Sequence, residues 1–294
     1  MFWDGKITSR QKHGVLICLP KLRGNPTPAD YRPITLLNSD YKILARMAAR
    51  RLHPIMDDHL THKQYCGIPG NTILDAVATV RDSIAYAESI NIPLCLISLD
   101  FKNAFDRVLH GYLFKILHGY GIGAPFINCI QHMYEGATSS IQINGHQYGP
   151  IPIRCAVCQG CPMSMALYTL GLHPLLKVLE QKLPGLRMGN QAHHTSVIAY
   201  ADNVTIFVTS IADFPITEEV FHLFERSSGA RLNPRKSKAI AVGRWCTRKT
   251  VLGIDYHTHA TILPPGDNPI AVNKYIISYQ HFGVPLRKQS MTVG

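Results

Sequence analysis

Two aspartates of this sequence stand where apolar runs end or turn. Asp100 closes the run PLCLISLDF, and Asp202 lies inside VIAYADNVTIFV. The first run predicts a buried strand and the second a β-hairpin. Two carboxylates that converge on one sheet could bridge two Mg²⁺ ions, the arrangement that stabilises the attacking and leaving oxygens of phosphoryl transfer. Asn203, next to Asp202, offers an uncharged amide where an acidic residue would add a second negative charge at the hairpin.

The order of the predicted elements determines whether these aspartates meet. Strand, helix, hairpin, helix and strand follow one another as βαββαβ, the ferredoxin-like arrangement, with a further helix inserted before the hairpin. In that sheet Asp100 and Asp202 are neighbours, so the fold class is α+β. Apolar spacing and capping signals place the elements. We expect helices over 40–52, 104–118, 164–183 and 217–229, and a further helix that begins at Thr72, where Thr72 and Asp75 form a capping box. We also expect a hairpin turning at 144–145 and a strand over 238–243.

Composition indicates the kind of partner. The 294-residue chain carries a net charge of +11 with 46% hydrophobic residues, so it can bury a sizeable core and attract a polyanion. Nucleic acid is the first candidate, a membrane surface the second, and a merely basic protein the alternative. No apolar run is long enough to span a bilayer and no secretory signal is recognised, so we expect an intracellular location, nucleus or cytoplasm.

Three cysteines suggest a different site. Cys155, Cys158 and Cys161 form CAVCQGC, a spacing also seen in zinc and iron–sulfur sites. A fourth ligand at matching spacing is missing, so we predict reduced thiols. A thiolate metalloprotein stays open as an alternative that metal analysis would test.

Six blocks in order resemble one family. They are LPKLRGNPTPADYRPITLLNSDYKILARMAARRL, LDFKNAFDRV, QGCPMSMALY, AYADNV, SGARLNPRKS and HFGVPL, over about residues 14–286. Together they resemble the reverse transcriptase domain of non-LTR (LINE-type) retrotransposons. The resemblance implies a right-hand polymerase fold with a palm of ferredoxin-like type and helical and β fingers, from which we expect the thumb to be missing here. It also implies an RNA template, a DNA primer and deoxynucleoside triphosphates as partners, and no membrane.

The resemblance assigns roles to single residues. Asp100, Asp202 and the backbone carbonyl of Phe101 would bind two Mg²⁺, with Mn²⁺ as a substitute, and Phe105 would exclude a 2′-hydroxyl. For Phe105 the alternative is a core residue, and for the basic residues below it is a solvated side chain. The remaining implied roles are triphosphate binding by Lys21 and Arg32, nucleotide and template contact by Gln159 and Gly160, protonation of pyrophosphate by Lys236, and a primer grip at Phe282 and Gly283.

The sequence departs from the family pattern in three ways. Asn203 replaces the second aspartate of the hairpin motif, Cys158 replaces an arginine before Gln159, and we expect no endonuclease or thumb. We therefore predict a reverse transcriptase (RNA-directed DNA polymerase) domain whose activity and metal binding are impaired. The alternative is a non-catalytic nucleic-acid-binding protein or an inert fragment of a decayed element. The predicted division is fingers over 1–93 and 121–155, palm over 94–120 and 156–245, and a primer-grip region with a truncated end over 246–294.

Overall fold

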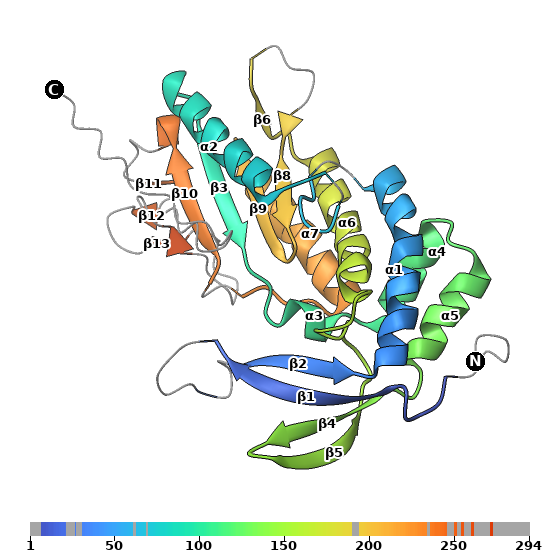
Figure 1. The fold of residues 1–294 in the computed structure, drawn as a ribbon. Helices are drawn as coiled ribbons and strands as arrows, with labels where there is room; N and C mark the ends of the chain where they lie inside the picture. Colours follow the sequence, from blue (N-terminus) through green and yellow to red (C-terminus); the bar gives the residue numbers. More distant parts are fainter. Residues whose placement is uncertain are drawn as a thin grey trace.

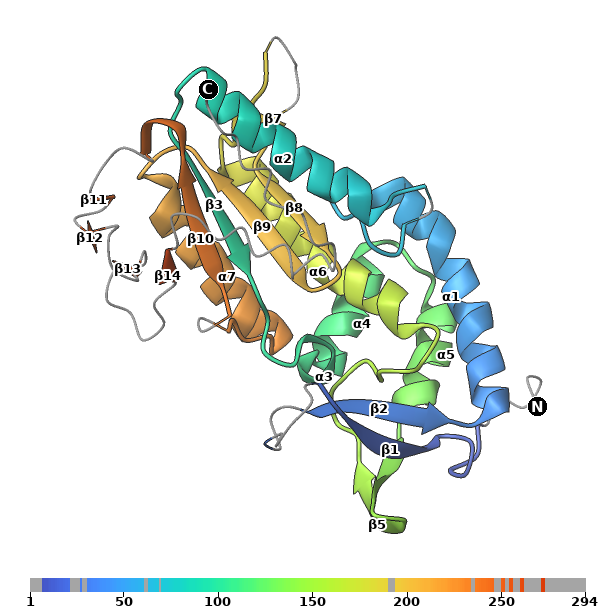
Figure 2. The same cartoon turned by 60° about the vertical axis from the view of Figure 1, so that its left-hand side comes forward.

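A computed structural model gives the fold of the chain (Figures 1 and 2). It describes residues 7–21, 27, 31–60, 63–68, 70–189, 194–233 and 236–245, and the short strands β11 (Thr250–Val251), β12 (Ile254–Asp255), β13 (Ala260–Thr261) and β14 (Ala271–Val272). The predicted primer-grip residues Phe282 and Gly283 lie outside the described residues.

The central sheet has the predicted βαββαβ order. Its strands lie in the order β10-β3-β9-β8, and β14 and β13 continue the sheet beyond β10. Every pair among the four central strands is antiparallel. Their bounds are β3 (Leu94–Leu99), β8 (Val197–Tyr200), β9 (Asn203–Val208) and β10 (Lys238–Val242). The first strand therefore lies beside the hairpin, as the sequence predicted.

Helices cover both faces of this sheet (Figure 2). On one face lie α6 (Ser164–Lys182) and α7 (Asp213–Ser228), and on the other lies α2 (Ile73–Ser89). The period-2 alternation of β3 explains both contacts, because Leu94 and Leu96 pack with α2 while Ile97 and Leu99 belong to the main core. Because it is covered on both faces, β3 is apolar at every position except Ser98.

A second sheet lies below the first in Figure 1. It is four-stranded, in the order β2-β1-β4-β5, and its β1–β4 pair is parallel. The strands are β1 (His13–Pro20), β2 (Tyr31–Leu37), β4 (Thr138–Ile143) and β5 (His146–Pro152). The sheet joins segments from both stretches of the predicted fingers, whereas the domain boundaries themselves stay a prediction.

The remaining helices surround the junction between the two sheets. Helix α1 (Ser39–His59) follows β2 directly and packs on α6, with α4 (His110–Gly119) and α5 (Ala124–Tyr134) beside it (Figure 1). The short elements are α3 (Ala104–Arg107), η2 (Gly243–Trp245), β6 (Leu186–Arg187) and β7 (His194–Thr195).

Local sequence signals predicted most elements correctly, and long-range hydrogen bonds account for one of the differences. The capping box of Thr72 and Asp75 is present, and Gly229 ends α7 in a left-handed conformation. The single helix expected over 104–118 is wrong: the chain is extended at Val108 and Leu109. There the Val108 carbonyl accepts the Ala156 N–H and the Leu109 N–H donates to Ser228, so partners outside the helix replace helical ones.

One helix start was misplaced, and one helix begins without the expected cap. Helix α7 begins at Asp213 and not at Thr217, because the Asp213 carboxylate accepts the N–H groups of Thr209 and Ser210. Ser164 does begin α6, but its hydroxyl donates to the Cys158 carbonyl and does not cap the helix.

Candidate active site

Asp100 is held by a turn that precedes β10. The Asn233 N–H donates to the Asp100 carbonyl over 2.8 Å, and the Asn233 side-chain amide donates to Oδ2 of Asp100 over 3.0 Å. The Asp100 N–H in turn donates to the Ser237 hydroxyl over 3.2 Å. Both the backbone and the carboxylate of Asp100 are therefore fixed by residues more than 130 positions away.

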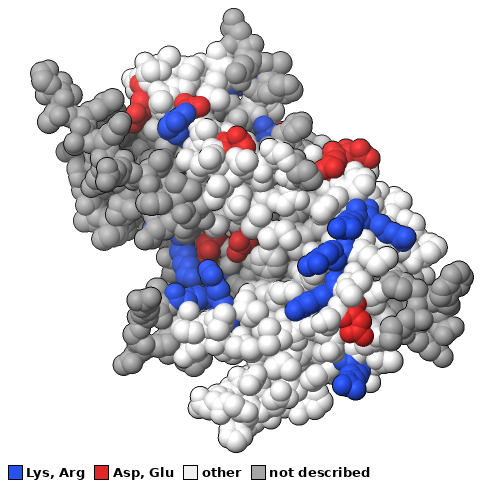
Figure 3. Space-filling view, in the orientation of Figure 1, with Lys and Arg blue, Asp and Glu red and all other residues white. Residues whose placement is uncertain are grey.

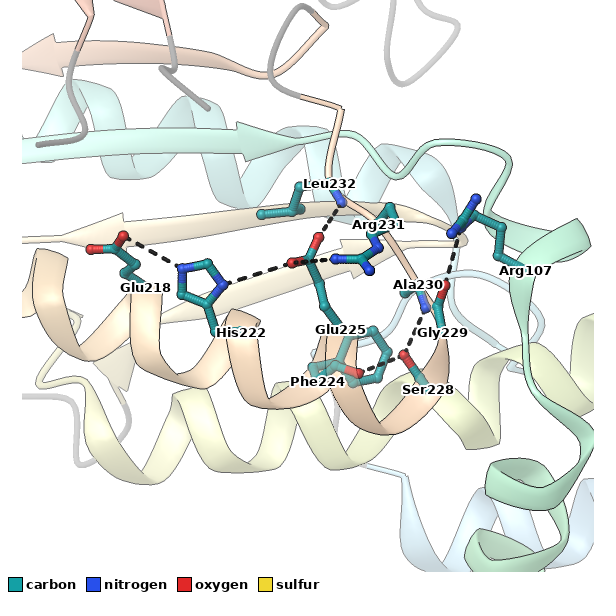
Figure 4. A network of polar contacts seen from close by, with 10 residues as sticks. All are labelled: Arg107, Glu218, His222, Phe224, Glu225, Ser228, Gly229, Ala230, Arg231 and Leu232. Carbon is teal, nitrogen blue, oxygen red and sulfur yellow. Dashed lines mark hydrogen bonds and ion pairs between the residues drawn. The ribbon is translucent and has the colours of Figure 1, made fainter. Parts of the chain in front are cut away.

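Glu225 on α7 orders the segment that carries Asn233 (Figure 4). Its carboxylate accepts the Leu232 N–H over 2.7 Å and lies 3.9 Å from the Arg231 guanidinium. His222, one turn earlier on the helix, points at the same carboxylate. A chain of polar contacts thus runs from α7 through Leu232 and Asn233 to Asp100.

Asp202 occupies a two-residue turn between β8 and β9. Tyr200 pairs with Asn203, which leaves Ala201 and Asp202 as the turn, so Asn203 begins a strand and does not stand at the tip of the hairpin. Val204 pairs with Leu99 on β3. The residues that follow and precede this pair, Asp100 and Asn203, therefore lie at the same end of the two strands.

Gln64 fixes this turn from outside the hairpin. Its side-chain oxygen accepts the Ala201 N–H over 3.2 Å and its amide donates to the Ala201 carbonyl over 3.4 Å. Ala201 has φ of 54°, a left-handed conformation that L side chains adopt at a cost of about 1–3 kcal/mol. Gln64 is completely buried, so its two hydrogen bonds help to offset that cost.

Tyr168 is a buried residue near enough to Asp202 and Asp100 for both charges to act on it. Burial raises the pKa of Tyr168 well above its ordinary value, and the negative charges of Asp202 and Asp100 raise this pKa further. The pairing of Leu99 with Val204 places Asp100 and the turn that carries Asp202 at the same end of the sheet, and the effect of both charges on Tyr168 agrees with this placement. The Tyr168 ring also stacks on Phe105, with centroids 4.5 Å apart and planes at 21°. Phe105 therefore packs on the phenol on which both aspartate charges act.

The predicted triphosphate and template residues gather around Asp106. The Gln159 amide donates to both carboxylate oxygens of Asp106, over 3.3 and 3.4 Å. Burial raises the pKa of Asp106, while the Gln159 hydrogen bond and the positive charge of Lys21 partly offset this rise. Lys21 directly follows the β1–β2 pair, in which Arg32 lies opposite Leu19. Figure 3 shows acidic and basic atoms side by side in the middle of this face.

Gly160 is required by close packing. Its φ is 105°, and a Cβ at this position would lie 2.6 Å from the Thr35 carbonyl oxygen of β2. The Thr35 N–H donates to the Gln159 carbonyl over 2.8 Å. The Gln159–Gly160 turn is therefore locked against the strand that carries Arg32.

Two further predicted residues flank Asp100. The Phe101 side chain is buried against Phe221 and Phe224, with ring centroids 6.1 and 5.8 Å away, so only its backbone faces the site. Lys236 lies in the turn that holds Asp100, where its N–H donates to Asn233, and its side chain is exposed.

Comparison with known proteins identifies the family. The model of the family "Reverse transcriptase (RNA-dependent DNA polymerase)" matches residues 18–259. The chain belongs to the reverse transcriptase family. A transposon TX1 protein of Xenopus laevis is 32% identical over 278 residues, which are 95% of this chain and 20% of that protein. An R2 retrotransposon Pol polyprotein of Popillia japonica is 30% identical over 229 residues, 76% of this chain and 31% of that protein.

A solved structure agrees at the level of the fold. Telomerase of Candida tropicalis, truncated from its C-terminal domain, matches with a TM-score of 0.59 at 14% identity, covering 85% of this chain and 54% of that one. The reverse transcriptase domain described here is therefore of the non-LTR retrotransposon type with a right-hand polymerase fold. It spans between a fifth and a third of the length of the two curated relatives named above. Among its described helices none is both long and apolar enough to cross a membrane.

The reverse transcriptase's cysteines are free thiols at the seven described positions. Across the described residues, no three His, Cys, Asp or Glu side chains come together as a metal site. Cys158 is packed against the core, and burial, with smaller contributions from Cys161 and Asp106, raises its pKa to about 11. Such a thiol is protonated at neutral pH and is a poor metal ligand.

The residues present fit the hard cations that reverse transcriptases use. Asp100 and Asp202 place two carboxylates over one buried phenol, and the repulsion between these negative charges is what a divalent cation would offset. Carboxylate and carbonyl oxygens are the ligands that Mg²⁺ prefers. The amide of Asn203 would offer an oxygen ligand without a charge. Asp100, Asp202 and Asn203 together therefore carry one negative charge less than three aspartates at these positions would carry.

Four residues of the site had no assigned role in the sequence analysis: Gln64, Asp106, Tyr168 and Asn233. Tyr168 and Asn233 lie inside the quoted blocks QGCPMSMALY and SGARLNPRKS, and Asp106 inside LDFKNAFDRV, so the motifs contained the signal. The sequence contains no such signal for Gln64, because its hydrogen-bond partner Ala201 is 137 positions away and no periodicity links the two residues.

Proposed function

We propose that this domain is built for RNA-templated DNA synthesis from deoxynucleoside triphosphates, and that Asn203 lowers its rate. The observation that carries the proposal is the convergence of Asp100 and Asp202 over Tyr168, at the ends of the palm strands. When bound by these carboxylates and the Phe101 carbonyl, two Mg²⁺ ions would stabilise the charge that develops on the transferred phosphoryl group.

The protein's own residues would position the nucleotide. We assign Lys21 and Arg32 to the triphosphate, because both lie at the same end of the β1–β2 pair. The Gln159–Gly160 turn supports template and nucleotide, since it is locked to β2 at one side and to Asp106 at the other. Lys236, exposed beside Asp100, would donate a proton to the departing pyrophosphate.

Phe105 would select the sugar. Its ring cannot turn freely, because Tyr168 stacks on it at 4.5 Å. A rigid aromatic ring at this place would clash with a 2′-hydroxyl and admit deoxynucleotides. Replacement of Phe105 by alanine should therefore raise the incorporation of ribonucleotides relative to deoxynucleotides.

The loss of charge at Asn203 should have a large effect on rate. Removing one charge-stabilising group from a site of this kind costs about 10²–10⁴-fold in rate, or several kcal/mol. Cys158 adds a second deficit, since an arginine there would stand near the carboxylate of Asp106, whose charge acts on this thiol. Nucleic-acid binding depends on distributed positive charge and should survive better than catalysis.

A primer-extension assay tests this proposal. The chain as written, with an RNA template, a DNA primer, the four deoxynucleoside triphosphates and Mg²⁺, should extend little or not at all. The double variant Asn203→Asp, Cys158→Arg should extend faster by about 10²–10⁴-fold, and Asp202→Ala in that variant should abolish extension. Equal rates for the parent and the double variant would show that Asn203 is a tolerated residue.

One observation favours a second candidate function. With Asn203 in place of an aspartate and a net charge of +11, the chain is equipped better for holding nucleic acid than for polymerising it. A protein that binds an RNA–DNA duplex with strong salt dependence, and that does not gain activity on repair of Asn203, would fit this candidate.

A further inference from the structure

Helix α1 has one face in the core and one face with a row of cations. The inner face is buried and combines three alanines with three large side chains: Tyr41, Ala45, Ala48, Ala49, Leu52 and Met56. On the other side Lys42, Arg46 and Arg50 follow one another at intervals of four residues, and we call these three residues the α1 ridge. Figure 3 shows basic atoms gathered over α1, on the same face as the candidate active site.

The ridge forms no ion pair within the part of the chain that the structure describes. None of its three side chains makes an ion pair with any residue that the structure describes, whereas Lys182 on α6 pairs with Glu219 and Arg81 on α2 with Asp82. From Tyr41 to Met56 the helix contains no acidic residue at all. The chain therefore keeps an uncompensated stripe of positive charge here.

This arrangement works against the helix that carries it. Like charges four residues apart destabilise a helix by about 0.2–0.5 kcal/mol per pair. Lys42 also stands in the first turn, where the helix dipole disfavours a cation. A helix selected for stability alone would carry acidic residues at these places, so an external anion explains the ridge better than folding does.

Two exposed apolar side chains accompany the cations. Ile43 is 60% exposed and Met47 is 46% exposed, and the two are one turn apart beside Arg46 and Arg50. An outer face that combines a row of cations with apolar side chains matches a single nucleic-acid strand, whose phosphates and base faces are both accessible. A duplex hides its base faces and would use only the charges.

Helix α1 is joined to the candidate active site through β2. Helix α1 begins at Ser39, two residues after β2 ends at Leu37, and β2 carries Arg32 and is locked to the Gln159–Gly160 turn. Four residues of helix advance about 6 Å along its axis, so the ridge offers evenly spaced cations along about 12 Å. We propose that the outer face of α1 binds single-stranded RNA, the part of the template outside the catalytic cleft; this rests on the proposed function for the identity of the strand.

A matched pair of variants tests the proposal. Arg46→Gln with Arg50→Gln removes two charges from the ridge, and glutamine keeps a helix propensity close to that of arginine. Lys115→Gln with Arg226→Gln removes two charges from exposed positions on α4 and α7, helices that pack on each other. Binding of a fluorescent single-stranded RNA of mixed sequence to the chain as written is followed by anisotropy at several salt concentrations, with circular dichroism as the check of folding.

The ridge variant should bind this RNA about tenfold more weakly, and the slope of log affinity against log salt should fall by about 1.4, because each lost contact to a single strand contributes about 0.7. The α4–α7 variant should stay within about twofold of the parent. Ile43→Ser with Met47→Ser should weaken binding of the single strand and leave binding of an RNA duplex unchanged. A single-stranded DNA of the same sequence shows whether the 2′-hydroxyl contributes.

Equal losses in the two charge variants would overturn the proposal, because only net charge would then matter. Unchanged RNA binding in the ridge variant would also overturn it and would indicate that the face binds another protein segment. The outcome is separate from the proposed function: Asp100→Asn with Asp202→Asn should remove metal binding and leave binding of the single strand intact. Failure of the ridge test in turn leaves the polymerase site untouched.

Discussion

The two aspartates of the site are held in different ways. At Asp100 the supporting turn reaches the carboxylate itself, through the Asn233 amide, as well as the backbone. At the β8–β9 turn the buried Gln64 side chain forms hydrogen bonds with the backbone N–H and carbonyl of Ala201, next to Asp202. Asn233 therefore orients the carboxylate of Asp100 directly, whereas Gln64 maintains the turn that carries Asp202.

Because the two supports differ, substitutions in them should affect metal binding and folding stability to different extents. A change at Asn233 should disturb metal binding more than folding, because the protein keeps its backbone contacts and loses one hydrogen bond to a carboxylate. A change at Gln64 should disturb folding more, because two half-buried backbone groups of Ala201 would lose their partner.

The largest effect on stability is expected at Gln64. Gln64→Ala leaves the half-buried N–H and carbonyl of Ala201 without these hydrogen bonds and empties a buried position, so it should lower the free energy of unfolding by about 2–3 kcal/mol. Urea denaturation measures the loss, with the exposed Gln147→Ala on β5 as the control. A loss below about 0.5 kcal/mol, the range of ordinary surface substitutions, would mean that the hairpin forms its turn without Gln64.

The next largest effect is expected on metal binding, at Asn233. Asn233→Ala removes the donor to Oδ2 of Asp100 and should weaken Mn²⁺ binding by about 10–100-fold, the range measured for outer partners of metal ligands. The free energy of unfolding should change by about 1 kcal/mol. Isothermal titration calorimetry measures the affinity, and Asn128→Ala, exposed on α5, is the control. Unchanged affinity for Mn²⁺ would show that Asp100 needs no side-chain support.

A smaller change in Mn²⁺ affinity is expected at Ser237, which belongs to the same support. Its hydroxyl accepts the Asp100 N–H and donates to the Asn233 carbonyl. Ser237→Ala should lower the free energy of unfolding by about 1–1.5 kcal/mol. Mn²⁺ affinity should fall by less than for Asn233→Ala, because the carboxylate contact remains. The reverse order of the two affinities would contradict a direct role for the Asn233 amide.

The smallest effect is expected at Ala201. Glycine adopts a φ of 54° without strain, but it also makes the unfolded chain more flexible. The two effects oppose each other, so Ala201→Gly should change the free energy of unfolding by no more than about 1 kcal/mol. Ala201→Val should be clearly destabilising, since a β-branched residue is a poor fit to a left-handed conformation. Thermal unfolding of the two variants decides this.

Sequence analysis predicted the palm because its signals are local and repeated. The apolar run before Asp100, the alternating hairpin and the order of elements were enough to bring Asp100 and Asp202 to one end of the sheet. The break at Val108 and Leu109, the support by Gln64 and the stack of Tyr168 on Phe105 depend on partners far away in the chain. Helical periodicity over 104–118 could not reveal that Ala156 and Ser228 would take those backbone groups.

The most direct test of the shared site is a titration with Mn²⁺ followed by electron paramagnetic resonance. The chain as written should bind Mn²⁺ weakly at a site that Asp100→Asn and Asp202→Asn each remove. Asn203→Asp should strengthen binding at that same site by at least about tenfold, since it restores a negative charge there. If Asp202→Asn removed the bound ion while Asp100→Asn left its affinity unchanged, the two aspartates would not share a metal site and the account would be wrong.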